Sequence, residues 1–189
     1  MRRTNANLIS LRPTTMDDLD NIMSWVNDKE VVANIANIKN VTRAQEREWL
    51  KATLASKEDK LFSIFKGKTY IGQCGLHKIY WPARNARIGI ILKKKYQGDG
   101  NGTAALQSLL RIAFEELQLH KVFCIVWEDN PQTIHLYRDK LGMKEEGRLI
   151  DEYYLNGKHH NMVRLYMLDH MWHDLVIEEL RKYDGYNWY

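Results

Sequence analysis

The 189-residue sequence predicts an α+β fold in which a mixed, mostly antiparallel sheet is flanked by helices. Two observations carry this prediction. Short apolar or alternating segments follow one another around turn signals, which is typical of antiparallel hairpins. Between two such segments, residues 87–93 and 122–127, a long stretch repeats its apolar residues at helical spacing. A helical crossover of this kind makes the strands that it joins parallel neighbours or near-neighbours.

The first half of the chain is expected to supply three strands and two helices. Pro13 ends the first alternating segment, and Gly67-Lys68 forms a Gly-X turn between the next two. Residues 28–40 have mixed character and are expected to form a loop over a site. The expected elements are strands at 8–12, 61–65 and 69–79 and helices that begin with capping-box signals at Thr15 and Thr42.

The second half opens with residues 87–93 and the crossover helix. Asn130-Pro131 is a helix start, with a capping side chain followed by proline at the first helical position, and Gly142 is a C-terminal stop. Asn156-Gly157 marks a hairpin turn. The remaining expected elements are strands at 122–127, 144–154 and 161–168 and a final helix at 170–183.

Composition limits the possible partners and the compartment. A net charge of +4 is too small to argue for nucleic-acid binding. No segment approaches transmembrane length, and the polar start lacks the apolar core of a signal peptide. Cys74 and Cys124 lie in strand-like apolar segments and fit buried, reduced thiols. We therefore expect a cytoplasmic protein with no nucleic-acid or membrane partner and no metal site.

The run from Tyr96 to Thr103 is the most informative stretch of the chain, because it places three glycines between a strand and a helix. Glycines allow the backbone to approach a ligand closely. Unpaired N–H groups and the positive end of the helix dipole then form an anion site suited to a phosphate or pyrophosphate. Lys93, Lys94 and Lys95 precede the run, and they form either a solvated strand end or a field that attracts phosphates.

Two familiar phosphate motifs fit this run poorly. No Walker A string occurs in the sequence. A Rossmann fingerprint starting at Gly98 and Gly100 would need a third glycine at position 103, which is Thr103. Because Glu128 and Asp129 follow the next strand, where an acid that binds a ribose would lie, the Rossmann fold stays as a weaker alternative.

The segment Gln97-Gly98-Asp99-Gly100-Asn101-Gly102 resembles the Q/R-x-x-G-x-G/A loop of the GCN5-related N-acetyltransferases, the GNAT family. Residues 134–137, 141–143 and 146–147 resemble the second half of that family, and residues 151–158 look closest to its spermidine and ribosomal-protein N-terminal acetyltransferases. The resemblance implies acetyl-CoA as the acetyl donor and a V-shaped splay between two parallel central strands. It also implies one N-acetyltransferase domain at 1–168, with a helical extension at 169–189.

The resemblance implies roles for individual residues. Tyr137 would be the acid that protonates the departing thiolate, and Asn130 would cap its helix, bond the pantetheine arm, or do both. Backbone N–H groups of Ile91 or Leu92 would bind the thioester oxygen. The residues expected to bind the cofactor are Ile91, Leu92, Gln97, Gly98, Asp99, Gly100, Asn101, Gly102, Thr103 and Asn130.

The general base is left open by the sequence. Related enzymes often carry an acidic residue in the register of Arg87, so the arginine is a departure from the family pattern. His77 on the preceding strand and Glu152 in the last hairpin are candidates. Proton loss through ordered water is an equal alternative.

The acceptor is also open. One wall of its site would be formed by Trp25, Asn27 and Asp28 with residues 34–40, and another by Asp151, Glu152, Tyr153 and Tyr154. Acidic and aromatic groups suit a polyamine, whereas Arg87 would repel a polycation and keeps a peptide N-terminus or an amino sugar as alternatives. A non-catalytic CoA-binding domain is a further hypothesis. The last helix, with Trp172 and Trp188, suggests a homo-oligomer such as a dimer.

Overall fold

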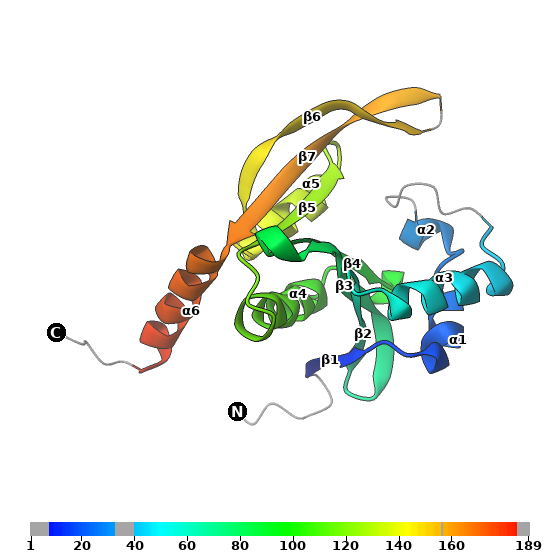
Figure 1. Cartoon of the computed structure of the whole chain (residues 1–189), viewed down its shortest axis with the longest axis horizontal. Coiled ribbons are helices and arrows are strands. Elements are labelled where there is room, and N and C mark those ends of the chain that lie inside the picture. Colours follow the sequence, from blue (N-terminus) through cyan, green and yellow to red (C-terminus); the bar gives the residue numbers. More distant parts are fainter. Residues whose placement is uncertain (1–7, 33–39, 156, 185–189) are drawn as a thin grey trace.

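The computed structural model describes residues 8–32, 40–155 and 157–184 of the chain. Its centre is a seven-stranded sheet in the order β1-β2-β3-β4-β5-β7-β6 (Figure 1). Every neighbouring pair of strands is antiparallel except β4 and β5, which are parallel. The strands are β1 (Ile9–Pro13), β2 (Lys60–Lys66), β3 (Thr69–Tyr80), β4 (Asn85–Leu92), β5 (Lys121–Trp127), β6 (Lys144–Leu155) and β7 (Lys158–Leu168).

The predicted mixed sheet with a splay is confirmed. Strands β4 and β5 pair only through Asn85, Ala86 and Arg87, whose partners are residues 121–123. Beyond these three pairs each strand remains attached to its other neighbour, β4 to β3 and β5 to β7. The two halves of the sheet therefore separate from Arg87 onward. A single parallel pair among the described strands is incompatible with a doubly wound sheet, so the Rossmann alternative is wrong.

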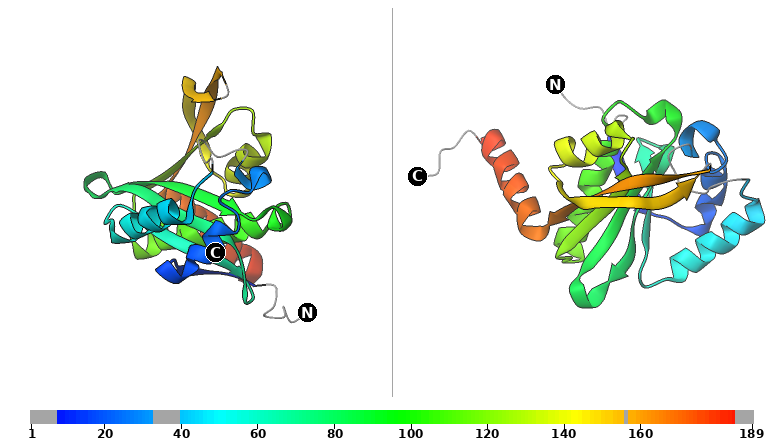
Figure 2. Two further views of the ribbon diagram at one scale, coloured as in Figure 1. Left: turned by 90° about the vertical axis from the view of Figure 1, so that its right-hand side faces the viewer. Right: turned by 90° about the horizontal axis from the view of Figure 1, so that it is seen from above.

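Helices cover both faces of the sheet. Helix α4 (Asn101–Arg111) continues as a π-helical turn (Ile112–Glu116), and its apolar stripe packs in the main core. Helices α1 (Leu19–Met23) and α3 (Arg43–Ala55) form a second core with residues of β2 and β3. Figure 2 shows these two groups of helices on opposite sides of the sheet. Each face of the sheet therefore has a packed core of its own.

Local signals placed most helix starts correctly. Both expected capping boxes form, with Thr15 and Asp18 before α1 and with Thr42 and Gln45 at α3. Asn130 caps α5 (Pro131–His135), which continues as a π-helical turn (Leu136–Lys140). In the segment that was expected to be a loop, a one-turn helix, α2 (Lys29–Val32), forms instead. Residues 33–39 lie outside the described residues.

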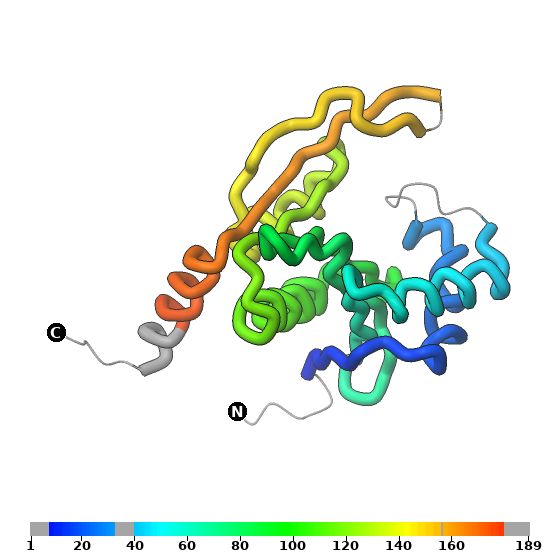
Figure 3. Tube along the Cα trace, viewed as in Figure 1, coloured from blue at the N-terminus to red at the C-terminus, as the bar shows by residue number. Residues whose placement is uncertain are grey.

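The last hairpin and the last helix differ in detail from the expectation. Strand β7 begins at Lys158 rather than at 161, so the β6–β7 hairpin is longer than predicted, and the trace in Figure 3 shows it reaching beyond the rest of the sheet. Helix α6 (Asp169–Asp184) is attached at its start: Trp172 stacks on Phe114 and donates from Nε1 to Glu115 at 3.1 Å. The Trp172 side chain therefore packs against residues of its own chain, whereas Trp188 lies outside the described residues.

Two further expectations concern the two cysteines and membrane-spanning helices. Cys74 and Cys124 are both free and buried, as predicted. No helix in residues 8–32, 40–155 and 157–184 is both long and apolar enough to cross a bilayer.

Candidate active site

The glycine run forms an open helix start next to the splay. Gly98 and Gly100 have φ values of 89° and 78°, and a Cβ on either residue would meet only open space. In the described structure, the backbone N–H groups from Gly98 to Thr103 donate to no other residue; the first bond of α4 runs from Ala104 to the oxygen of Gly100. Free donors at the positive end of a helix of this length make an anion site.

Two side chains hold this helix start in place. Gln97 donates from Nε2 to the carbonyl oxygen of Leu92 at 2.9 Å. Asn101, which is 5% exposed, donates from Nδ2 to the carbonyl oxygen of Tyr96 at 2.9 Å. Their amide groups therefore fix the loop to the end of β4, while Asp99 and Thr103 leave their side chains without a described hydrogen bond.

The lysines before the glycine run pack on aromatic rings. The Nζ atom of Lys93 lies 5.1 Å from the centre of the Tyr70 ring, and that of Lys95 lies 5.0 Å from the centre of the Tyr96 ring. Burial and the charge of Lys95 lower the pKa of Lys93. These contacts keep positive charge near the anion site, and they give the triplet a packing role as well.

The backbone N–H groups of β4 point alternately to β3 and to the splay, and this alternation determines which of them can bind a ligand there. Lys93 donates to Ile71 on β3, and a Cβ built on Gly72 would overlap the carbonyl oxygen of Ile91. Because backbone groups alternate sides along a strand, Ile91 also faces β3, whereas Ile90 and Leu92 face the splay. The geometry therefore supports the N–H of Leu92 as an oxyanion donor and not that of Ile91. The N–H of Ile90, which the sequence did not suggest, faces the splay too.

These residues fit the diphosphate and thioester ends of a CoA derivative. The open helix start offers N–H donors and room for an anion, and the splay offers strand edges without a ladder partner in the described structure. An acyl-CoA supplies an activated acyl group when bound. The chain would hold its diphosphate at residues 98–103 and its thioester between β4 and β5.

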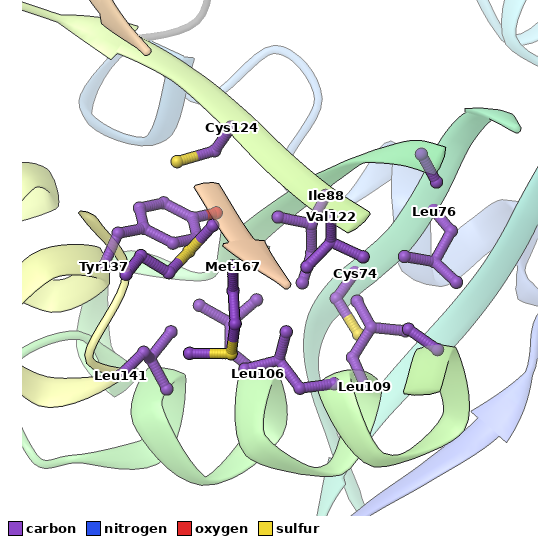
Figure 4. Packing of buried hydrophobic residues seen from close by; sticks show 14 of the residues in the cluster. Cys74, Leu76, Ile88, Leu106, Leu109, Val122, Cys124, Tyr137, Leu141 and Met167 are labelled. Carbon is purple, nitrogen blue, oxygen red and sulfur yellow. The ribbon is translucent and has the colours of Figure 1, made fainter. Parts of the chain in front are cut away.

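Tyr137 lies in the main core on the α4 side of the sheet. It is 3% exposed, and burial raises the pKa of its hydroxyl well above the usual value. In Figure 4 its ring lies beside Cys124, and its hydroxyl is directed toward Ile88 and Val122, which flank the start of the splay. A phenol kept protonated at this place can act as a proton donor, so the predicted role stays a prediction with a suitable geometry.

Asn130 uses its side chain as a helix cap. Its Oδ1 atom accepts from the N–H of Thr133 at 3.1 Å, and Pro131 follows at the first helical position. Its Nδ2 group donates to no described residue. Asn130 therefore caps α5 through its Oδ1 atom, and its amide N–H₂ group can still bind a ligand.

The N-terminal wall differs from the expectation. Trp25 is 3% exposed and donates from Nε1 to the hydroxyl of Tyr70 at 3.1 Å, within the second core. Its ring is not available as an open surface. Asp28 is exposed, and its carboxylate accepts from the N–H of Glu30 at the start of α2. Most of the 34–40 segment lies outside the described residues.

The opposite wall is an irregular part of the β6–β7 hairpin. Leu149 pairs with Met162 and Tyr153 pairs with His160, so β6 carries two extra residues between these pairs. The bulge exposes Glu152 and gives Asp151 a φ of 53°. Bulges of this kind redirect side chains near functional sites.

Aromatic rings and acids surround a hollow beside this bulge. Trp127, at the end of β5, meets Tyr153 at 5.3 Å and His160 at 5.1 Å between ring centres, edge to face. The hollow has a volume of about 320 Å³ and is lined by Glu128, Asp129, Asp151, His159, His160 and Asn161. Of the predicted wall, Asp151 lines the hollow and Tyr153 lies beside it, against Trp127. Sequence reasoning missed the other lining residues because they come from separate segments, the turn after β5 and strand β7.

Asn161 organises the acids of this hollow. It accepts at Oδ1 from the N–H of Asp151 at 3.0 Å and donates from Nδ2 to Glu128 at 2.8 Å. Glu128 also pairs with Arg148 at 2.5 Å. Asp129 and Asp151 make no ion pair with any described side chain. Their carboxylates are therefore available to solvent and to a cationic ligand.

A buried acid on α3 was also missed. Glu46 is 6% exposed, and burial raises its pKa. It lies one helical turn before the buried Leu50 and therefore on the same face of α3. That spacing was the signal that could have found it.

The open anion site, the splayed parallel pair and the buried phenol define an acyltransferase that takes its acyl group from a CoA thioester. Comparisons with known proteins agree. A family model described as an acetyltransferase (GNAT) domain matches residues 9–144. Since this match covers more than half of the chain, the protein belongs to the GNAT acetyltransferase family. It is an acetyl-CoA-dependent N-acetyltransferase by class.

Relatives narrow the class further. The chain is 27% identical over 168 residues to the spermidine N(1)-acetyltransferase of Escherichia coli, covering 89% of this chain and 90% of that one. It is 35% identical over 101 residues to the enzyme of the same name from Vibrio cholerae and to the putative ribosomal N-acetyltransferase YdaF of Bacillus subtilis. These two matches span 58% and 55% of those proteins, and 53% of this chain.

A solved structure shares nearly the whole fold. The crystal structure of the Vibrio cholerae spermidine N-acetyltransferase in complex with CoA and spermine superposes with a TM-score of 0.82 at 26% identity. The likeness covers 87% of this chain and 97% of that chain.

Proposed function

We propose that the chain acetylates a primary amine of a polyamine, by direct attack on acetyl-CoA in a ternary complex. The observation that carries the choice of acceptor is the hollow at the β6–β7 hairpin. There Asp129 and Asp151 are unpaired among the described side chains, and the rings of Trp127 and His160 lie beside them. Carboxylates and ring faces attract ammonium groups, and a polyamine carries several of these along one chain.

The relatives support the same acceptor. Proteins named spermidine N(1)-acetyltransferase match 89% of the chain, and a structural neighbour is described in complex with spermine. Tyr137 would give a proton to the departing sulfur, and Leu92 would donate its N–H to the thioester oxygen. Asn130 would hold the pantetheine arm through its free amide N–H₂ group.

The test is a turnover screen read by a thiol reagent that detects released CoA. Spermidine and spermine are expected to give the highest kcat/KM among polyamines, peptides and amino sugars. Asp129→Asn combined with Asp151→Asn should raise KM for spermidine roughly tenfold, which corresponds to about 1.4 kcal/mol. Asparagine keeps the positive φ accessible at position 151, so the backbone of the bulge is retained.

Control variants make the result specific. Glu116→Gln, at an exposed acid that ends the π-helical turn after α4, should leave KM unchanged. The double variant should also leave the acetyl-CoA dissociation constant unchanged, as measured by calorimetry. A wild-type enzyme that releases no CoA with any polyamine would contradict the proposal.

The second candidate acceptor is a protein N-terminus. Arg87 is exposed where β4 begins to separate from β5, and its charge there disfavours a polycation. One relative is named a putative ribosomal N-acetyltransferase. Turnover with peptides at a higher kcat/KM than with spermidine would favour this acceptor.

We propose a cytoplasmic location, because two buried free thiols fit a reducing compartment. A homo-oligomer also stays a prediction. Light scattering of the purified chain would test it.

A further inference from the structure

An imidazole beside the start of the splay is held at one ring nitrogen, and its other ring nitrogen makes no hydrogen bond to a described residue. His77 is the cross-strand partner of Arg87, the last residue of β4 that pairs with β5. Its Nδ1 atom lies 3.1 Å from Oδ1 of Asp59, and its side chain is 23% exposed. His77 is therefore both oriented by a carboxylate and accessible from solvent.

The second ring nitrogen lies over Gly75 of β3. A Cβ built on Gly75 would come 3.0 Å from Nε2 of His77, and one built on Gly89 would come 4.0 Å from its Cδ2. Gly75 and Gly89 are cross-strand partners, two residues further than His77 and Arg87 in the direction in which β4 and β5 separate. Residues two apart on a strand share a face. The position beside Gly75 is already filled by the Leu61 side chain and the carbonyl oxygen of Lys60, whereas a Cβ on Gly89 would meet only Cδ2 of His77, so the room beside the imidazole ring lies over Gly89.

The backbone holds this arrangement rigidly. The N–H of Ile79 donates to the oxygen of Glu58 at 2.8 Å, which anchors the residue next to Asp59 against β3. Lys78, which follows His77, has a φ of 51° within a bulge between His77 and Tyr80. Positive φ at a lysine costs of order 1–3 kcal/mol and is found preferentially at functional sites.

The face of the sheet matters for the chemistry. Cys74 and Leu76 point into the main core with Tyr137, so His77 and Gly75, which alternate with them, point to the other side. The splay connects the two sides. An acid on one side and a base on the other suit a reaction in which the nucleophile enters from one face and the leaving group departs on the opposite one.

We propose that His77 is the general base of the acetyl transfer and that Asp59 is a positioning residue, an assignment that rests on the function proposed above. With Nδ1–H donated to Asp59, the lone pair lies on Nε2. Nε2 takes one proton from the acceptor ammonium and passes it to water.

The remaining steps balance the reaction. The lone pair freed on the amine nitrogen forms the N–C bond, and the C–S bond breaks with its electron pair going to sulfur. Tyr137 gives sulfur a proton, and the second proton that leaves nitrogen returns to Tyr137 through water. The net result is one amide, one thiol and one proton released to solvent.

The charges around His77 set its protonation. Among the described residues, two charged groups shift its protonation: Asp59, from the segment before β2, and Arg87, on β4. Burial lowers the pKa of His77; Asp59 opposes this effect, and Arg87 adds to it, so the pKa stays below its usual value. The imidazole is therefore neutral and able to accept a proton near pH 7.

The test compares His77→Gln and Asp59→Asn with His173→Gln, an exposed histidine on α6, as the matched control. We expect His77→Gln to lower kcat at least about 100-fold, as for the loss of a general base, with an unchanged dissociation constant for acetyl-CoA. Wild-type kcat/KM should fall with decreasing pH below roughly 6.5. His77→Gln should lack this acid limb, and Asp59→Asn should shift it to lower pH because the group that raises the pKa is gone.

A measurement independent of turnover uses the ¹⁵N resonances of the His77 ring in the wild-type protein with CoA bound. The Nδ1 atom should be protonated and Nε2 unprotonated at neutral pH, and the Nε2 resonance should move when spermidine is added. Full kcat with a retained acid limb in folded His77→Gln would overturn the assignment, as would an Nε2 resonance that spermidine does not move. If the wild-type protein transfers acetyl to no amine, the function proposed above fails instead, and the ¹⁵N titration still decides whether Nε2 meets the amine.

Discussion

The side chain of Gln97 reaches back to the last residue of β4, where its Nε2 atom donates to the carbonyl oxygen of Leu92 at 2.9 Å. The oxygen of Leu92 faces the splay and has no ladder partner among the described strands. This bond therefore fixes the separation between the anion site at α4 and the oxyanion donor on β4. A ligand that occupies both sites depends on that separation.

Gln97→Ala should weaken acetyl-CoA binding by roughly three- to tenfold, since one neutral hydrogen bond contributes about 0.5–1.5 kcal/mol. The effect should appear in the dissociation constant measured by calorimetry, with kcat at saturation nearly unchanged. Gln107→Ala, on the body of α4, is the matched control and should leave binding as it is. Equal affinities for the wild type and Gln97→Ala would show that the bond does not position the loop.

Local patterns predicted the strands, the helix starts and the anion site. Capping boxes at Thr15 and Thr42, the Gly67 turn and the glycine run act over a few residues, so their signals survive in the sequence alone. The parallel pair followed from the crossover helix, and its splay followed from the resemblance of the glycine run to a known loop.

The features that the sequence did not indicate depend on contacts between distant segments. Trp25 was expected in a wall of the acceptor site, but Tyr70, 45 positions away, accepts its indole N–H inside the second core. The direction of Ile91 and Leu92 depends on the register of β4 against β3. Asp59 meets His77 only because β2 lies beside β3, and no local pattern indicates such a pair.

Tyr137→Phe should lower kcat by at least roughly 100-fold if the phenol is the proton donor to sulfur. The ring lies in the main core, and its hydroxyl makes no hydrogen bond to a described residue, so the free energy of unfolding should be nearly unchanged. Acetyl-CoA affinity should also be retained. Tyr166→Phe, on β7, controls for the loss of a hydroxyl elsewhere. Wild-type turnover by a folded Tyr137→Phe would remove this residue from the mechanism.

Gly102→Ala separates the need for glycine in the fold from the need for it in the ligand site. A Cβ on Gly102 would meet Leu92 at 3.5 Å and Leu136 at 3.7 Å, which are ordinary contacts. Alanine is favoured over glycine in a helix by about 1 kcal/mol. The variant should therefore unfold at the same or a higher urea concentration, yet bind acetyl-CoA more weakly, because the methyl group narrows the approach to the free N–H groups.

Gly100→Ala is the informative partner of that variant. Its φ of 78° is unfavourable for alanine, although no atom lies within 4 Å of the added Cβ. Alanine should cost roughly 1–2 kcal/mol of stability through backbone strain alone. For the Gly102→Ala variant of the preceding paragraph, an unchanged acetyl-CoA affinity would mean that the diphosphate does not bind at residues 98–103.

Asp18 links the first strand to the second core and makes stability depend on pH. Its carboxylate, almost fully buried, lies 2.6 Å from the guanidinium of Arg12 and accepts from the N–H of Thr15 at 2.9 Å. Burial opposes ionisation, but the N–H of Thr15 and the guanidinium outweigh it, so the pKa of Asp18 falls below its usual value.

A carboxyl whose pKa is lower in the folded than in the unfolded state stabilises the fold fully above the unfolded pKa and loses that contribution as the pH falls through the folded one. Asp18→Asn should therefore lower the free energy of unfolding by about 1–3 kcal/mol near pH 7, as for a hydrogen bond to a charged group. Urea unfolding at a series of pH values should show the difference from wild type shrinking only below about pH 4. Asp17→Asn, the exposed neighbour, should follow the wild-type curve. A difference that stayed constant down to the lowest measurable pH would mean that Asp18 acts through its shape and hydrogen bonds, and not through its charge.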